Sequence, residues 1–308
     1  MKLIKILLEQ NERPKAIIIA GSGGAGKSTL LKNLDLQDIE MFNLDDFVEK
    51  QGFSMVNANI NVDLQIRQAM VNRKNFVWQT TAGNADKIKS IVDAGYDVFM
   101  VMVYTHPFIS FIQNFNREER KLPTPVVLST WKNTYSLIDF YKNLLKDNFV
   151  LVVGTDQEEY KSEVEQFNNA ARQGGESIEK FIKDYTASEP EKFTSTLSKP
   201  FSIEDREALA AYEKSIKGVD FNRDDKGMQK YLMKHFMGFW ERGKMPPMGS
   251  MEKKKEAILK DRLKRKEEMK STTDAISSTL LDPQFKQKLN SAISIDQVKS
   301  KIQNFISS

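Results

Sequence analysis

A short glycine-rich segment near the N-terminus carries the clearest chemical signal in the chain. Residues 21–28 read Gly-Ser-Gly-Gly-Ala-Gly-Lys-Ser and fit the pattern G-x-x-x-x-G-K-[ST], directly after an apolar run and before a helical pattern. Glycines let backbone N–H groups approach phosphate oxygens closely, and the start of a helix favours an anion. Lys27 would bridge the β and γ phosphates of ATP, and Ser28 would offer its hydroxyl to Mg²⁺. The predicted nucleotide-binding residues are Gly21, Ser22, Gly23, Gly24, Ala25, Gly26, Lys27, Ser28 and Thr29.

The same glycines admit a second interpretation. They also satisfy G-x-G-x-x-G, and Asp45 follows at about the distance expected of a ribose-binding acid in a dinucleotide site. That weaker motif leaves Lys27 and Ser28 without a role, so a nucleoside-triphosphate site is favoured. A purely structural glycine turn is the remaining alternative.

An acidic pair follows the next apolar run. Residues 42–47 read Phe-Asn-Leu-Asp-Asp-Phe, and they resemble the element that carries the catalytic acid in zeta-toxin-like and polynucleotide kinase-like P-loop kinases. The resemblance covers residues of about 14 to 156. It implies that Asp45 activates the acceptor hydroxyl and helps to bind Mg²⁺, with Asp46 beside it as a substrate contact. Alternatively, the two acids only cap the following helix.

Residues 78–84, Trp-Gln-Thr-Thr-Ala-Gly-Asn, resemble the acceptor-site turn of the same families. The resemblance makes Thr81 and Asn84 candidate substrate contacts, although a polar turn after a strand is commonly structural. The run that precedes the turn lacks the terminal aspartate of a Walker B motif. Binding of Mg²⁺ would therefore depend on Ser28, phosphates, water and Asp45.

A third segment resembles the arginine-bearing lid of these kinases. Arg117, Arg120 and Lys121 lie just before Leu122-Pro123. Guanidinium groups there would neutralise charge on the transferred phosphoryl group, and Arg117 is the better match. The alternative is a solvated helix end that these cations form with neighbouring glutamates.

The chain as a whole has the pattern of an α/β protein. Short apolar runs alternate with helical patterns, which predicts a parallel sheet with helices on both faces. The runs lie at residues 16–20, 39–44, 76–80, 98–104 and 149–153. Helices are expected to begin near Pro107, Thr124 and Asp282. The expected division is a P-loop kinase domain (1–157), a helical region (158–249) and a charged helical tail (250–308).

Composition narrows the remaining choices. The 308 residues include no cysteine, which excludes disulfides and thiolate chemistry, and two histidines, of which His106 has no evident partner in the sequence. The longest apolar run, 98–104, is too short to cross a bilayer, so a cytoplasmic protein without a membrane role is expected. Residues 253–270 hold nine Lys and Arg against four Asp and Glu. Such a run could bind nucleic acid, but a solvated helix is favoured.

These observations predict an ATP-dependent kinase that transfers the γ-phosphoryl group to a hydroxyl. The acceptor stays open between a nucleic-acid end, a nucleoside, a nucleotide sugar and a protein. Many relatives carry an arginine three residues after the catalytic acid, where this chain has Val48. The alternative is a non-catalytic ATP-binding protein whose C-terminal helical region engages a protein partner. An NAD-dependent oxidoreductase is the third class considered.

Overall fold

Five parallel strands form one sheet in the computed structural model, which describes residues 13–34, 36, 39–47, 55–116, 122–154, 159–188 and 251–308. The strand order is β2-β3-β1-β4-β5. The strands are β1 (Lys15–Ala20), β2 (Glu40–Asn43), β3 (Phe76–Thr80), β4 (Asp97–Tyr104) and β5 (Phe149–Val153). Each lies within a residue of its predicted run at both ends, and the predicted fold class is confirmed.

Helices follow the strands and also make up the described C-terminal part of the chain. They are α2 (Lys27–Lys32), α3 (Met55–Val71), α4 (Ala85–Asp93), α5 (Pro107–Phe115), α6 (Thr124–Tyr135), α7 (Ile138–Leu145), α8 (Lys161–Gln173), α9 (Gly175–Ser188), α12 (Met251–Leu281), α13 (Pro283–Asn290) and α14 (Ile295–Ser307), with a 3-10 turn η2 (Lys146–Asn148). The helix starts predicted at Pro107, Thr124 and Asp282 are confirmed, and the Asp282 carboxylate accepts a hydrogen bond from Gln284 N at 2.8 Å.

The register of the strands brings the candidate site together at one edge of the sheet. Ala20 of β1 lies opposite Thr80 of β3, and Asn43 of β2 lies opposite Gln79 of β3. The glycine-rich loop, the turn after β3 and the acidic pair after β2 therefore leave neighbouring strands at nearly the same level. Carboxyl ends of parallel strands are the usual position of ligand sites in open α/β sheets.

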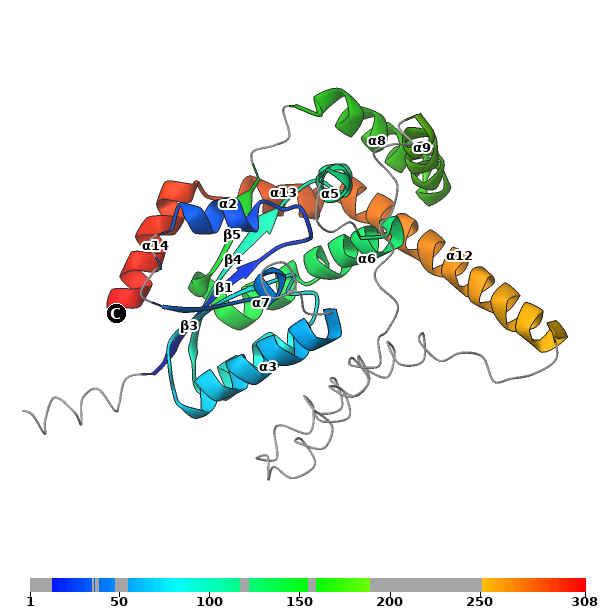
Figure 1. Ribbon diagram of the computed structural model, residues 1–308. Coiled ribbons are helices and arrows are strands. Elements are labelled where there is room, and N and C mark those ends of the chain that lie inside the picture. Colours follow the sequence, from blue (N-terminus) through cyan, green and yellow to red (C-terminus); the bar gives the residue numbers. More distant parts are fainter. Residues whose placement is uncertain are drawn as a thin grey trace, which may run out of the picture.

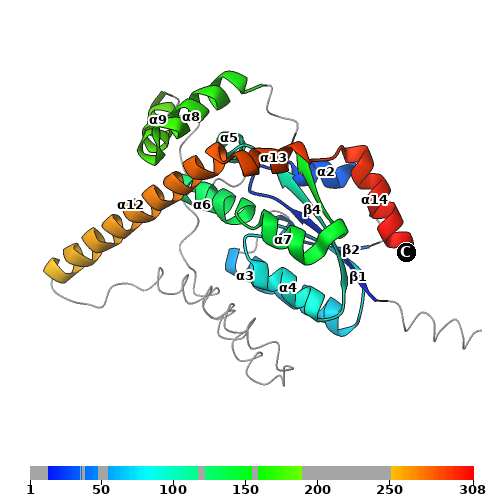
Figure 2. The ribbon, with the colours of Figure 1, turned by 180° about the vertical axis from the view of Figure 1, so that it is seen from behind.

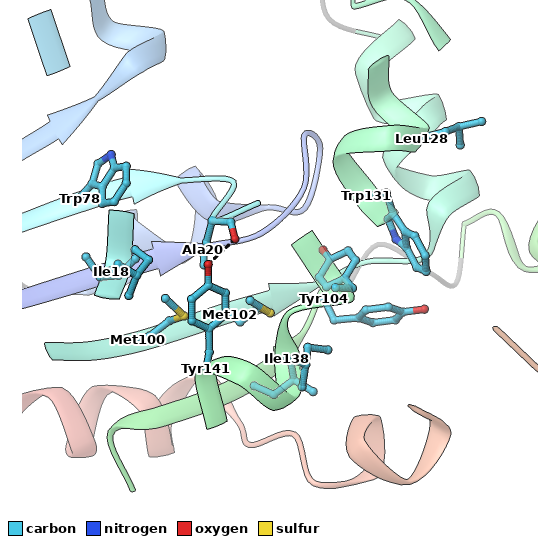
Figure 3. Packing of buried hydrophobic residues seen from close by; sticks show 14 of the residues in the cluster. Ile18, Ala20, Trp78, Met100, Met102, Tyr104, Leu128, Trp131, Ile138 and Tyr141 are labelled. Atoms are coloured by element: carbon cyan, nitrogen blue, oxygen red, sulfur yellow. Dashed lines mark hydrogen bonds between the residues drawn. The ribbon is translucent and has the colours of Figure 1, made fainter. Parts of the chain in front are cut away.

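Both faces of the sheet are covered by helices (Figure 1), as Figure 2 shows from behind. On one face, apolar residues of α3, α4, α6 and α7 pack against alternate strand residues such as Ile18, Trp78 and Met100. Tyr141 of α7 lies beside Met100 and Met102 in this layer (Figure 3). Helix α13 adds Phe285 to the same cluster, with its ring centroid 5.7 Å from that of Tyr104.

The opposite face is covered by α2 and by α14, which comes from the far end of the sequence (Figure 1). Val298, Ile302 and Phe305 of α14 are buried there, and the ring centroid of Phe305 lies 5.3 Å from that of Phe99 on β4. Just before α14, Ile293 N donates to Leu151 O on β5 at 2.9 Å. Residues 293–305 therefore share a core with the sheet, while the division of the chain at residues 157 and 249 stays a prediction.

Within the part of the chain that the structure describes, no helix combines the length and the apolar character that crossing a bilayer requires.

Helix α14 yields a stability prediction. We expect Phe305→Ala to lower the free energy of unfolding by about 3 to 5 kcal/mol, because it leaves a cavity against Phe99. The matched control Ile306→Ala changes the neighbouring residue, which is 37% exposed against 9% for Phe305, and should cost less than about 1 kcal/mol. Denaturant unfolding monitored by circular dichroism measures both. Equal small losses would show that α14 does not stabilise the sheet.

Candidate functional site

The glycine-rich loop follows β1 and passes close to β4 and α5. Gly21 has φ 151°, and a Cβ on it would lie 2.7 Å from Val103 O, so any side chain there would collide with backbone. Gly24 has φ 76°, and its Cβ would lie 3.0 Å from the Cβ of Gln113 on α5. Both positions therefore favour glycine, because of their positive φ and because neighbouring atoms of β4 and α5 approach closely.

The two polar residues that close the motif lie at the start of α2. The Lys27 ammonium group donates to Gly21 O at 2.9 Å and to Ser22 O at 2.8 Å, so it lies over its own loop. Ser28 is exposed at the surface, and its Oγ is 3.5 Å from Nε2 of the buried Gln79. A cation and a hydroxyl thus flank the loop, as binding of a phosphate and its metal ion would require.

A cluster of buried hydroxyl groups from α5 and α6 contacts the glycine-rich loop. Ser22 is fully buried, and its Oγ lies 3.2 Å from both Ser110 Oγ on α5 and Tyr135 Oη on α6. Ser110 Oγ also donates to Gly23 O, and Tyr135 Oη donates to Val103 O at 2.8 Å. Because both of those protons are used, we infer that Ser22 Oγ donates its proton to one of these two hydroxyl oxygens.

The turn after β3 is also held by α6 and α7. Thr134 Oγ1 donates to Thr81 O at 2.9 Å, and Tyr141 Oη donates to Ala82 O at 2.7 Å. Asn84 ends the turn, and its side chain accepts from Asp86 N at 2.9 Å as the N-cap of α4. The structure thus gives Asn84 a capping role, and the exposed Thr81 side chain lies at the carboxyl edge of the sheet.

The acidic pair follows β2 at the same edge. Asp45 and Asp46 are partly buried, and Asp45 N donates to Asn43 Oδ1 at 3.1 Å. The side chain that begins this turn is therefore Asn43 rather than either acid. The assigned roles of Asp45 and Asp46 stay predictions.

Helix α5 is fixed by a histidine at its start. His106 is the N-cap of α5, where Nδ1 accepts from Phe108 N at 3.3 Å, and Nε2 lies 3.1 Å from Asn168 Oδ1 on α8. The sequence indicated no partner for His106, and the structure supplies one because α8 lies against α5 in space. Burial lowers the pKa of His106 to about 4. The ring is therefore neutral at pH 7, in keeping with its cap acceptor.

The segment expected to form a lid, which contains Arg117 and Arg120, lies outside the described residues. The residues on either side of it are joined, because Asn114 Nδ2 donates to Leu122 O at 2.9 Å and Leu122 N donates to Asn114 Oδ1 at 3.0 Å. Residues 155–158, after Gly154, also lie outside. A Cβ on Gly154 would lie 3.4 Å from Ala25 O, so β5 ends beside the glycine-rich loop.

Four site residues were not predicted from the sequence. Gln79 interrupts an otherwise apolar strand, and that break in the pattern is a signal that could have identified it. Ser110, Thr134 and Tyr135 occupy buried helix positions, where their hydroxyl groups cannot be distinguished in sequence from ordinary packing residues. Among the residues that the structure describes, no three His, Cys, Asp or Glu side chains gather as a metal site.

The strand order, together with the loop between β1 and α2, defines the class of protein as an α/β fold of the P-loop NTPase type. The family model described as zeta toxin matches residues 2–45, which include β1, the glycine-rich loop and Asp45. The resemblance to zeta-toxin-like P-loop kinases is confirmed in this N-terminal segment. No protein of curated function matches the chain.

Three solved structures resemble the chain distantly. AvrRxo1-ORF1:-ORF2 with ATP has 14% identity and a TM-score of 0.40 over 50% of this chain and 58% of its own. The PezAT toxin-antitoxin system of Streptococcus pneumoniae has 14% identity and a TM-score of 0.34 over 70% and 93%. Shikimate kinase from Acinetobacter baumannii, in complex with shikimate, has 15% identity and a TM-score of 0.31 over 61% and 99%. Likeness at this level is too weak to support a function.

The buried His106 predicts a loss of stability in acid. His106 takes up a proton near pH 6.5 in the unfolded chain and only near pH 4 in the folded chain. The free energy of unfolding therefore keeps the full contribution of neutral His106 above pH 6.5, and it falls by about 3 kcal/mol as the pH drops to 4. His106→Asn keeps a good cap but cannot titrate, so we expect it to flatten this fall. Urea unfolding of both proteins between pH 7 and pH 4 measures the difference. Parallel curves would contradict it.

Proposed function

We propose that this chain is an ATP-dependent kinase that transfers the γ-phosphoryl group to a hydroxyl. The observation that carries the proposal is the loop of residues 21–28. It has the complete G-x-x-x-x-G-K-[ST] sequence and joins β1 to α2 at the carboxyl edge of a parallel sheet. The Lys27 ammonium group lies over this loop, within 3 Å of two of its carbonyl oxygens.

The residues of the loop suit ATP with Mg²⁺. On binding, Lys27 would exchange the carbonyls of Gly21 and Ser22 for the β and γ phosphates, which bear full negative charge. Ser28 would ligate Mg²⁺ through Oγ, and the neighbouring Gln79 amide would orient that hydroxyl. The ion, once bound, neutralises charge on the phosphates.

The acceptor would lie over the ends of β2 and β3. We assign Asp45 to orient the acceptor hydroxyl and accept its proton, and to contribute to the metal site, with Asp46, Thr81 and Asn84 as substrate contacts. The proton leaves the hydroxyl for Asp45 as oxygen attacks the γ phosphorus, and the bond to the β-phosphate oxygen breaks to release ADP.

The lid completes the proposal. Arg117, with Arg120 as a second cation, would approach the transferred phosphoryl group from residues 117–121. The hydrogen bonds between Asn114 and Leu122 join described residues on either side of that segment, and Asn114 belongs to helix α5, which touches the glycine-rich loop. A protein partner for the C-terminal helical region stays part of the proposal, as does a cytoplasmic location.

The phosphate contact of Lys27 can be tested by calorimetry. We expect Lys27→Ala to weaken ATP binding about 10- to 100-fold, because a charge-assisted bond to phosphate contributes about 1.5 to 3 kcal/mol. Lys32→Ala, at the exposed end of the same helix, is the matched control and should leave affinity unchanged. Equal affinities for all three proteins would contradict the assigned cradle.

The role of Asp45 is tested by a transfer assay with labelled ATP and the four acceptor classes. Asp45→Asn keeps the size of the side chain but cannot take up the proton, so turnover should fall at least about 100-fold while ATP affinity changes little. Asp46→Asn should cost less. A larger loss in Asp46→Asn would transfer the catalytic role to Asp46. Tight ATP binding without transfer in the wild type would favour a non-catalytic ATP-binding protein.

A further inference from the structure

Two adjacent side chains in the last turn of α6 reach two different loops of the candidate site. Tyr135 contacts the glycine-rich loop, and Thr134 contacts the turn of residues 81–84. Both side chains are buried, at 2% and 0% exposure. One turn of helix thus contacts both the nucleotide side and the acceptor side of the proposed site.

The hydroxyl group of Tyr135 is fully used. It donates to Val103 O at 2.8 Å, and it accepts from Ser22 N at 3.3 Å and from Thr105 N at 3.2 Å. A phenol oxygen offers one proton and two lone pairs. Ser22 Oγ, at 3.2 Å, shares the accepting side of this oxygen with the two backbone N–H groups. Tyr135 therefore fixes the position of Ser22, the second residue of the glycine-rich loop, relative to the end of β4.

Thr134 makes a single long-range bond, from Oγ1 to Thr81 O at 2.9 Å. It holds the backbone of the turn at the point where the chain leaves β3. The next position, Ala82, has φ 51°, a conformation that non-glycine residues adopt rarely. Tyr141 holds the carbonyl of that residue from α7, so the shape of the turn is imposed by the helices beside it.

Helix α6 is itself fixed in place. Trp131 Nε1 donates to Thr105 O at 2.8 Å, and the indole ring packs against Phe285 of α13 at a centroid distance of 6.3 Å. The N-terminal end of the helix is joined to α5 through Leu122 and Asn114. Helix α6 thus has its own contacts with β4, α13 and α5, besides those to the two loops.

We propose that Thr134 and Tyr135 are positioning residues that hold the glycine-rich loop and the turn of residues 81–84 in one fixed relation, so that ATP binding orders the acceptor turn. The inference rests on the proposed function, because it assigns ATP to the loop. Packing alone does not account for the pair, since valine and phenylalanine would fill the same space without buried hydroxyl groups.

Hydrogen exchange with mass spectrometry tests the coupling without knowledge of the acceptor. Backbone amides of residues 80–84 are followed in the full chain with and without Mg-ATP, and calorimetry measures ATP affinity in parallel. In the wild type, we expect ATP to slow exchange at 80–84 at least about threefold. Thr134→Val should keep ATP affinity within about threefold and lose this slowing, and Thr134→Ser, which retains the hydroxyl, should restore it.

Tyr135→Phe should weaken ATP binding about 10-fold, because it leaves Ser22 N and Thr105 N without their acceptor. Ser136→Ala is the matched control and should behave as the wild type, since Ser136 is the C-cap of α6 and its hydroxyl donates to Asn133 O of that helix. If ATP slows exchange at residues 80–84 as much in Thr134→Val as in the wild type, the inference is overturned. The proposal that the chain binds ATP would not be affected by that result. Failure of the wild type to bind ATP would overturn the proposed function, and the inference with it.

Discussion

Backbone groups that are buried where parallel strands end must find hydrogen-bond partners, and the rest of this site follows from that constraint. Beyond Ala20 and Thr80 the ladder between β1 and β3 stops, and the chain enters two loops that form no regular structure. A loop rich in glycine has few side chains that could serve as partners for its own backbone, and Lys27 is one of them. The structure supplies the others from outside, through the hydroxyl groups of Ser110, Thr134 and Tyr135. The helices beside the sheet thereby determine the shape of the site as well as cover the core.

The same hydroxyl groups show why the glycine-rich loop can be identified from the sequence more readily than the helix side chains that hold it in place. The loop of residues 21–28 is a local pattern whose chemistry is carried by neighbouring residues, and the parallel strands are continuous apolar runs because both their faces are buried. Tyr135 lies on an apolar helical stripe with Trp131, and the spacing that correctly predicted its burial says nothing of where its oxygen points. Its partners Ser22 and Val103 come from distant parts of the chain.

The acidic pair after β2 shows a second kind of detail that the sequence does not predict. The sequence placed Asp45 after β2, and the register of β2 with β3 confirms that this strand ends beside Gln79. Strand ends can be inferred from hydrophobic runs, whereas the direction of a carboxylate depends on the turn that carries it. Here the Asn43 side chain accepts the hydrogen bond that begins the turn. The sequence offers Asn43, Asp45 and Asp46 as similar polar candidates for that bond and does not show which one makes it. Gln79 was likewise visible only as a polar break in β3, and its proximity to Ser28 required the fold.

The position of α14 has a consequence for how the protein is made. Phe99 and Val101 on β4 are covered by a helix encoded much later in the chain, after the whole helical region has been synthesised. At 5–20 residues per second, roughly 10 to 40 seconds separate translation of β4 from translation of Phe305. During that interval the part of this face that α14 covers, which includes Phe99, stays apolar and lacks that helix, and exposed apolar surface is what makes nascent chains associate or recruit chaperones. A sheet that takes part of its cover from a helix about 200 residues downstream therefore carries an exposed apolar patch for as long as that stretch takes to be made.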